Sequence, residues 1–421
     1  MNERNPAMGR LTAAAPDLSV FLSLGFRPLY ICGCAWALIS AAIWIFAPAV
    51  VPAPFFAVAW HAHEMLWGFI ATIAVGFLLT ASATWTGFNP MQGRPLAFIV
   101  LTWVAARAAY LIGGETAFMA GVVLESTFFG YSAFKLMQVM LKGKSVRNYG
   151  IPVLVLGLGA SNVLFLLATL QGDYLLVIDR FNTGMLFMAV LTILIARRVI
   201  PFFAGRMVPG LDIPMLAGSG RIQLVVGGLA IAAGLLKLHA IMAAGLAIVG
   251  LIGLYQLWSW KPRAVLHKPM LWILYLGYLS LAIGLLAAAA HLFGIGGVFL
   301  ARAATHVHII GMGGFAVLII GMVTRTALGH TGRPLALDAS MLASYWLMVA
   351  AVVLRLAALW PSAYSGSLLH ATATAWLLSL GLYLYRYVPI LIRPRADTAS
   401  KPGGTLQPGG RPAGASQSGQ R

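Results

Sequence analysis

Two pairs of histidines are the residues of this sequence best suited to hold a metal ion or a haem. Each pair has one intervening residue: His61 and His63 form the first, and His306 and His308 the second. Neutral imidazole is a common ligand of haem iron and of copper. Successive helical residues turn by about 100°, so the two rings of a pair point to nearly opposite sides. A regular helix therefore cannot chelate one ion with such a pair, but it can serve two centres on its two flanks.

Charged and soft side chains lie next to both histidine pairs. Glu64 follows His61 by three residues and shares its helical face. Arg302 precedes His306 by one turn, where a guanidinium can pair with a haem propionate. Met65 lies one turn from His61 and offers a thioether to copper. Simpler roles compete with these, because intramembrane histidines often bond neighbouring helices and terminal arginines often extend to lipid head groups.

The composition indicates which elements must position these residues. The 421 residues are 60% hydrophobic and 9% charged, with a mean hydropathy of +0.88, whereas soluble domains carry about a quarter charged residues. Apolar runs of about 18 residues or more predict transmembrane helices. We therefore predict an all-α, polytopic membrane helix bundle of about twelve spans. The spans are expected at 26–48, 57–83, 94–112, 115–141, 149–170, 176–199, 221–236, 239–259, 270–292, 297–324, 339–359 and 364–391.

Lysine and arginine predict the orientation of these spans. With both termini cytoplasmic, nearly all basic residues fall in cytoplasmic loops and almost none in the outer loops. This gives a cytoplasmic segment at 1–25, a transmembrane domain at 26–391 and a disordered cytoplasmic tail at 392–421. The net charge of +18 is then a topology signal that suits anionic lipids. Nucleic acid is a poor partner, because the positive loops are short and scattered.

The predicted topology gathers most histidines in the outer half of the bilayer. Ionisable groups there are costly and usually functional. Glu125 lies in the same half, as do Arg107 and Arg355, and Glu64 and Glu125 are the candidate proton carriers. No CxxCH motif is present, which excludes a covalently attached c-type haem. No short-period repeat is visible, and a diverged six-plus-six duplication stays open. The outer histidines are His61, His63, His239, His291, His306, His308 and His370.

Longer blocks of the sequence resemble the NnrS family. The second predicted helix reads WHAHEMLWGF at 60–69, followed by GFLLTA at 76–81 and WTG at 85–87. The WHAHEM block and a second block, LGHTGR at 328–333, are long and specific. Together with shorter matches they run in order over about residues 21–397. The shorter matches are FRP at 26–28, RVIPFF at 198–203, Arg325, PIL at 389–391 and PRAD at 394–397.

This resemblance implies a haem- and copper-containing protein of the bacterial cytoplasmic (inner) membrane. NnrS proteins are associated with nitric oxide, in denitrification and in resistance to nitrosative stress. The resemblance supports His61, His63, Glu64 and His306 as family positions. It also supports His330, in a cytoplasmic turn, which we interpret as a conformational or surface element rather than a ligand. It departs at His308, where relatives usually have an aliphatic residue.

The resulting hypothesis is a b-type haem between the second and tenth helices, in the periplasmic half. The expected axial ligands are His61 or His63 together with His306, with Arg302 at a propionate. Copper is expected on the other flank of these helices. Further metal-ligand candidates are His308, His291, His370 and Met65.

Two other classes of function fit the same sequence. A secondary transporter would use twelve spans and buried ionisable groups without any metal. A haem or copper sensor or trafficking protein would bind the cofactor without turnover. Enzymatic redox activity on nitric oxide is left open, because it needs an electron donor that the sequence does not identify.

Overall fold

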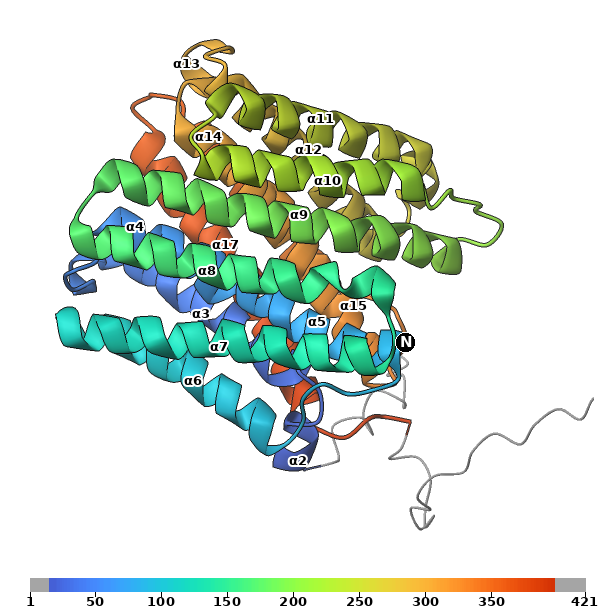
Figure 1. Cartoon of the computed structure of the whole chain (residues 1–421). Coiled ribbons are helices and arrows are strands. Elements are labelled where there is room, and N and C mark those ends of the chain that lie inside the picture. Colours follow the sequence, from blue (N-terminus) through green and yellow to red (C-terminus); the bar gives the residue numbers. More distant parts are fainter. Residues whose placement is uncertain (1–14, 398–421) are drawn as a thin grey trace, which may run out of the picture.

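The protein is a bundle of long helices (Figure 1). The computed structural model describes residues 15–397, and all regular elements in that range are helical. Twelve of its helical segments are long and apolar enough to cross a membrane. This confirms the predicted all-α polytopic bundle. Residues 1–14 of the predicted N-terminal segment and 398–421 of the predicted tail lie outside the described residues.

The spans lie close to their predicted positions. Ten of them are single helices: α3 (Phe26–Phe46), α6 (Arg94–Ile112), α7 (Glu115–Lys142), α8 (Gly150–Gln171), α9 (Tyr174–Met207), α10 (Ala217–Leu235), α11 (His239–Ser259), α12 (Pro269–Leu292), α16 (Ala339–Ala358) and α17 (Ser365–Leu391). The second and tenth spans are each made of three segments: α4 (Ala57–His63), η2 (Glu64–Ala71) and α5 (Thr72–Thr86), and α14 (Ala303–His308), η5 (Ile309–Ala316) and α15 (Val317–His330). Short helices lie between or before the spans: α2 (Leu18–Phe21), η1 (Pro48–Val50), η3 (Val146–Asn148), η4 (Pro262–Val265) and α13 (Gly297–Leu300).

The tenth span begins later than the apolar run predicts. The run starts at 297, but Gly296 and Gly297 have φ angles of 110° and 62°. These left-handed conformations suit glycine and interrupt a helix. They separate α13 from α12. Arg302, with extended φ and ψ angles of −81° and 115°, separates α13 from the membrane helix, which starts at Ala303.

Loops lie at the two ends of the bundle, which we call the histidine end and the terminal end. The histidine end, on the left in Figure 1, carries α4, α13 and α14. The terminal end, on the right, carries both described ends of the chain. There the Asp17 amide donates to the Ile392 carbonyl at 2.9 Å, and Arg27 donates to the Leu391 carbonyl at 2.6 Å. The first and last spans, α3 and α17, pack against each other.

Two spans contain a π-helical segment, and in both it begins directly after a histidine pair. η2 follows His63 and η5 follows His308. The two π-helical segments contact each other. Hydrogen bonds in a π-helix run from residue i to i+5, and such segments are frequent at functional sites.

The two π-helical spans match at a constant offset of 245 residues. The surrounding helices correspond as well, because α6 begins at Arg94 and α16 at Ala339, which is the same offset, and α3 packs against η2 and α5 as α12 packs against η5 and α15. The first four spans therefore correspond to the last four, with α8–α11 between them. This arrangement differs from the six-plus-six duplication that the sequence left open. Matched residues include His61 and His306, His63 and His308, Gly68 and Gly313, Gly76 and Gly321, and Gly87 and Gly332.

Candidate functional site

A cavity of about 290 Å³ lies between the second and tenth spans, toward the histidine end. Its walls are mainly aromatic, aliphatic and methionine side chains from α3, the second span, α8, α9, the tenth span, α16 and α17. A largely apolar pocket with a few converging polar groups is the usual form of a cofactor site. The polar lining residues are His61, Tyr174, Asn182, His308, Arg355 and Thr372.

His61 lines this cavity. The ring stacks on Trp44, with centroids 5.0 Å apart and planes inclined by 10°. Its Nδ1 atom is buried and has no hydrogen-bond partner among residues 15–397. Leaving a buried polar atom unpaired is costly unless a ligand satisfies it. His61 is therefore held in place by stacking and has a nitrogen available.

His308 reaches the cavity from the opposite span. Its Nδ1–H donates to the Ala304 carbonyl at 2.7 Å. This bond leaves Nε2 with its lone pair, which is the arrangement that ligating histidines commonly adopt. His308 and Arg355 are close enough to interact electrostatically with His61. Within the described part of the chain Arg355 has no ion-pair or hydrogen-bond partner, so a cation without a counter-charge lines the cavity.

His63 faces away from the cavity and lies in a buried ionic cluster. Its Nδ1 is 2.9 Å from Glu64 Oε1, and its Nε2 is 3.0 Å from Glu125 Oε2. Arg107 donates to both carboxylates, at 2.7 Å to Glu64 Oε2 and also to Glu125 Oε1. Tyr110 donates to Glu125 Oε2 at 3.1 Å. All five members of the cluster are buried, and the cluster joins the second span to α6 and α7.

The cluster occupies both ring nitrogens of His63. A neutral imidazole donates only one hydrogen bond. Therefore either His63 carries two N–H groups, or one of the two carboxyl groups is protonated. With a doubly protonated His63 the cluster holds two positive and two negative charges, and buried charges persist when they are paired in this way. In either case both ring nitrogens of His63 are engaged and neither offers a lone pair to a metal. The proton that distinguishes the two cases lies on His63, Glu64 or Glu125.

His306 also lies outside the cavity, on the other flank of the tenth span. It faces His291 at the end of α12, with ring centroids 4.9 Å apart and planes inclined by 43°. His306 is 7% exposed, and its Nδ1 has no hydrogen-bond partner in the described chain. The Nδ1–H of His291 donates to the Leu300 carbonyl at 2.8 Å.

The remaining predicted site residues are spread over the histidine end. Arg302 donates to the Leu359 carbonyl at 2.8 Å and does not line the cavity. His370 is exposed and donates through Nδ1 to the Gly366 carbonyl at 2.9 Å. Met65 lines the cavity together with His61. Over residues 15–397, no group of three or more His, Cys, Asp or Glu side chains is arranged to hold a metal.

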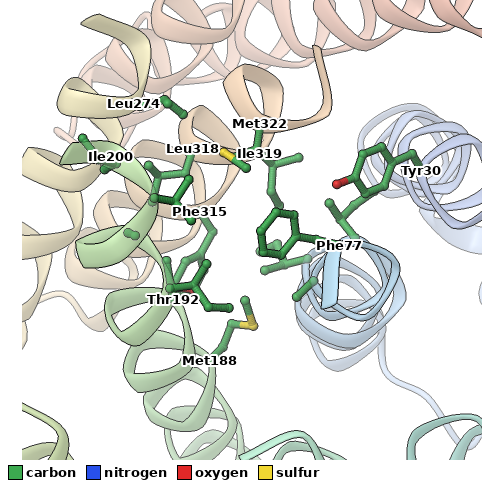
Figure 2. Close-up of a pocket in the computed structure, with 16 residues that line it drawn as sticks. Tyr30, Phe77, Met188, Thr192, Ile200, Leu274, Phe315, Leu318, Ile319 and Met322 are labelled. Atoms are coloured by element: carbon green, nitrogen blue, oxygen red, sulfur yellow. The ribbon is translucent and has the colours of Figure 1, made fainter. Parts of the chain in front are cut away.

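An apolar crevice of about 90 Å³ adjoins the cavity on its terminal-end side. Ile70 and Phe315, one from each π-helical segment, line both spaces. Figure 2 shows Phe315 and Met188 on one side of the crevice and Phe77 on the other. Apolar spaces of this kind stay dry and accept small neutral molecules.

Comparison with known proteins identifies the family. The family described as NnrS protein matches residues 20–395, nearly the whole chain. The chain belongs to the NnrS family. No curated protein matches it. The family match confirms the resemblance carried by the WHAHEM and LGHTGR blocks.

In this NnrS family member, the direction of each side chain is what sequence reasoning missed. The sequence predicted His306 as the ligand from the tenth span, whereas His308 is the histidine that shares the cavity with His61. Arg355 takes the position at the cavity that was expected for Arg302. The sequence indicates Arg355 only through its depth, because this residue falls in the predicted outer half. The direction of its side chain depends on the packing of α16.

Proposed function

We propose that this protein binds a b-type haem in the cavity and handles nitric oxide there, as a component of the bacterial inner membrane. One observation carries the proposal: His61 and His308, from two different spans, line the same cavity, and each has a ring nitrogen without a hydrogen-bond partner in the described chain. Handling includes binding, detoxification or protection against nitrosative stress. Membership of the NnrS family supports the choice of haem as the cofactor and of nitric oxide as the molecule that it binds.

The donor set fits a haem. The neutral imidazoles of His61 and His308 would hold the iron, and the unpaired Arg355 would pair with a propionate. Gly311 lines the cavity, and a Cβ added there would meet no heavy atom within 4 Å. The wall at this point is therefore open to a flat ligand. The cavity volume of about 290 Å³ is near the lower end of the range for small-molecule sites, about 300–1,000 Å³.

The residues of the chain would bind and orient the group. Stacking on Trp44 fixes the plane of the His61 ring, and the Ala304 carbonyl fixes the tautomer of His308. The apolar walls exclude water. A bound haem would supply a ferrous iron, and binding of nitric oxide to it would require either His61 or His308 to leave the iron. Nitric oxide is neutral, so it needs no polar channel to reach a site within the bilayer.

Turnover would require more than binding. Reduction of nitric oxide consumes protons, and Glu64 and Glu125 are the proposed carriers because they share a proton with His63. Electrons would come from a donor outside the chain. A haem-dependent sensor or trafficking protein would use the same cavity without these steps.

A reduced-minus-oxidised optical spectrum of the detergent-purified protein tests the haem site. We expect a b-type band in the wild type that is lost or shifted in His61→Ala and in His308→Ala. His370→Ala is the matched control, because His370 lies at the same end and bonds a carbonyl in the same way. A colourless wild type from haem-replete cells would overturn the proposal and favour the metal-free transporter.

Two further measurements refine the assignment. His306→Ala should keep the haem band, since His306 lies outside the cavity; its loss would restore the ligand predicted from the sequence. Continuous removal of nitric oxide in the presence of a supplied reductant would indicate turnover. Uptake that stops at one equivalent per haem would instead indicate sensing or trafficking.

A further inference from the structure

We propose that the apolar crevice beside the haem cavity binds small neutral gases from the lipid and passes them to that cavity between Ile70 and Phe315. Nitric oxide and carbon monoxide belong to this class of molecule. The crevice has a volume of about 90 Å³ and is lined mainly by the second span, α9 and the tenth span. Binding of a gas in the crevice does not depend on the haem, whereas passage to an iron rests on the proposed function.

The two four-span units build opposite walls of the crevice from matched positions. Each lining residue of the second span has a counterpart 245 positions later that also lines the crevice. In both spans these residues lie at i, i+3, i+4 and i+7, which is the spacing of one helical face. The crevice is therefore the space between two corresponding faces, at the junction of the units. The matched pairs are Ile70 and Phe315, Ile73 and Leu318, Ala74 and Ile319, and Phe77 and Met322.

The walls of the crevice suit a gas better than water. Among the lining residues only Tyr30 and Thr192 carry a hydroxyl group, and all the others are hydrocarbon or thioether side chains. A buried water molecule usually makes about three hydrogen bonds. Figure 2 shows Tyr30 and Thr192 on opposite sides of the crevice, so one water molecule cannot bond both. Apolar cavities with so few polar groups stay dry and bind apolar guests such as xenon.

The crevice reaches the surface of the bundle within the membrane-spanning helices. Several of its lining side chains are only half-buried, although they belong to spans. Side chains at the surface of a span face lipid, and neutral gases dissolve in lipid. A gas can therefore enter the crevice from the bilayer without crossing a polar layer. The half-buried side chains are Ala74 and Phe77 of α5, Thr192, Ile195 and Val199 of α9, and Met322 of α15.

Ile70 and Phe315 form the boundary between the crevice and the haem cavity. Both residues line both spaces, and both are buried. They are matched residues of the π-helical segments η2 and η5, which contact each other. Core side chains change rotamer even in well-packed proteins. A gas in the crevice thus needs only the rotation of these two side chains to reach the cavity.

The four-span correspondence supplies substitutions for a test. The counterpart of Ala74 is an isoleucine, and the counterpart of Ile70 is Phe315. Ala74→Ile should therefore fill the crevice, and Ile70→Phe should narrow the passage, each with a side chain that the matched position already holds. Phe315→Ile should widen the passage by the reverse exchange. Ala81→Ile is the matched control, because Ala81 lies on the same helix as Ala74 and lines neither space.

Diffraction from crystals under xenon pressure tests the gas site whether or not haem is bound. We expect one anomalous xenon peak in the crevice of the wild type and of Ala81→Ile, and none in Ala74→Ile. A wild-type crevice without xenon would overturn the site, as would a xenon peak that Ala74→Ile leaves unchanged. Density for a lipid or detergent chain in the crevice, in place of xenon, would also overturn it and assign the space to lipid.

Laser photolysis of carbon monoxide from the reduced, haem-loaded protein tests the passage. Photolysis leaves a position on the iron empty, so the measurement does not wait for a histidine to leave. We expect Ile70→Phe and Ala74→Ile to slow the escape of the gas about tenfold, which corresponds to about 1.4 kcal/mol in the barrier. Phe315→Ile should accelerate the escape, and Ala81→Ile should leave it unchanged.

Unchanged haem spectra and melting temperatures would show that these variants are folded and loaded. Equal escape rates in the wild type and all four variants would overturn the passage. The haem proposal fails separately from the gas site. A colourless protein would overturn the haem and with it the passage, whereas xenon in the crevice of that protein would still establish the gas site.

Discussion

Glu125 shows how much a single buried carboxylate can determine in this bundle. It has no contact with solvent, and it accepts hydrogen bonds from Arg107 and Tyr110 while facing His63. Removing one member of such a cluster leaves the others buried without full compensation. The cluster is therefore expected to stabilise the contact of α6 and α7 with the second span as well as to hold a proton.

Glu125→Gln should destabilise the protein by about 3 kcal/mol or more, because it leaves Arg107 and His63 with one carboxylate between them. Glu115→Gln is the matched control, since Glu115 is exposed on the same helix. Its effect should stay within about 0.5 kcal/mol. Thermal unfolding in detergent measures both. Equal stability of the two variants would contradict a structural role for the cluster.

Gly68 and Gly311 predict opposite outcomes for the same substitution. A Cβ at Gly68 would collide with Glu64 Oε2 and lie 2.7 Å from an Arg107 nitrogen, so Gly68→Ala should destabilise the protein. Gly311→Ala meets no atom within 4 Å and should preserve or raise the melting temperature. Gly311→Phe should instead fill the cavity and lower haem content in a folded protein. A stable Gly68→Ala variant would show that the cluster can move aside.

At the residue scale, the sequence predicts that the two histidines of each pair lie apart, but not which residues each of them contacts. The helical turn of about 100° per residue predicts that His61 and His63 lie on different flanks, and they do. The same geometry separates His306 from His308. The ionic partners of His63 could not be predicted, because Arg107 and Glu125 reach it only through the packing of α6 and α7. The choice of His308 for the cavity likewise depends on how the tenth span is rotated.

At the scale of elements, hydropathy predicts the spans but not the π-helical segments within two of them. The twelve spans follow from apolar runs, because a backbone in lipid must satisfy its own hydrogen bonds. The π-helical segments η2 and η5 have no comparable signal, since the apolar pattern across them is continuous. Their recurrence after both histidine pairs is a feature that the two four-span units share.

Asp338, the N-cap of α16, predicts a pH dependence at the terminal end. Its side chain accepts bonds from the Met341 amide at 3.0 Å and the Ser340 hydroxyl at 2.7 Å, and it pairs with Arg386 at 2.7 Å. Burial alone would raise the pKa of Asp338, but these bonds and the Arg386 charge outweigh it and lower the pKa below 3.8. The native carboxylate therefore adds stability above the unfolded-state pKa, and that stability is lost as pH falls through the lower native pKa.

Asp338→Ala should cost about 1 kcal/mol near neutral pH, because it removes the cap. Asp338→Asn keeps a good capping residue and should lose mainly the acid dependence. Melting temperatures of the wild type and both variants, measured from pH 7 down to pH 3, check this. An identical acid limb in Asp338→Asn would assign that dependence to other carboxylates.

At the scale of the whole molecule, the chain brings its beginning and its end together. Asp17 bonds Ile392, Arg27 bonds Leu391, and α3 packs along α17. The loop between α9 and α10, at 208–216, opens at the same end of the bundle (Figure 1). The four-span units thus lie side by side, closed by the first and last helices and separated in sequence by α8–α11.

Because the two ends of the chain lie together, the order of the spans along the polypeptide can be changed without changing their arrangement in space. A circular permutant that joins Asp397 to Ala15 through a short linker and starts in the 208–216 loop should insert, fold and keep every contact described above. Its melting temperature and haem spectrum should match those of the wild type. A permutant that only aggregates would contradict this. A gene that begins between the two four-span units would therefore encode the same bundle.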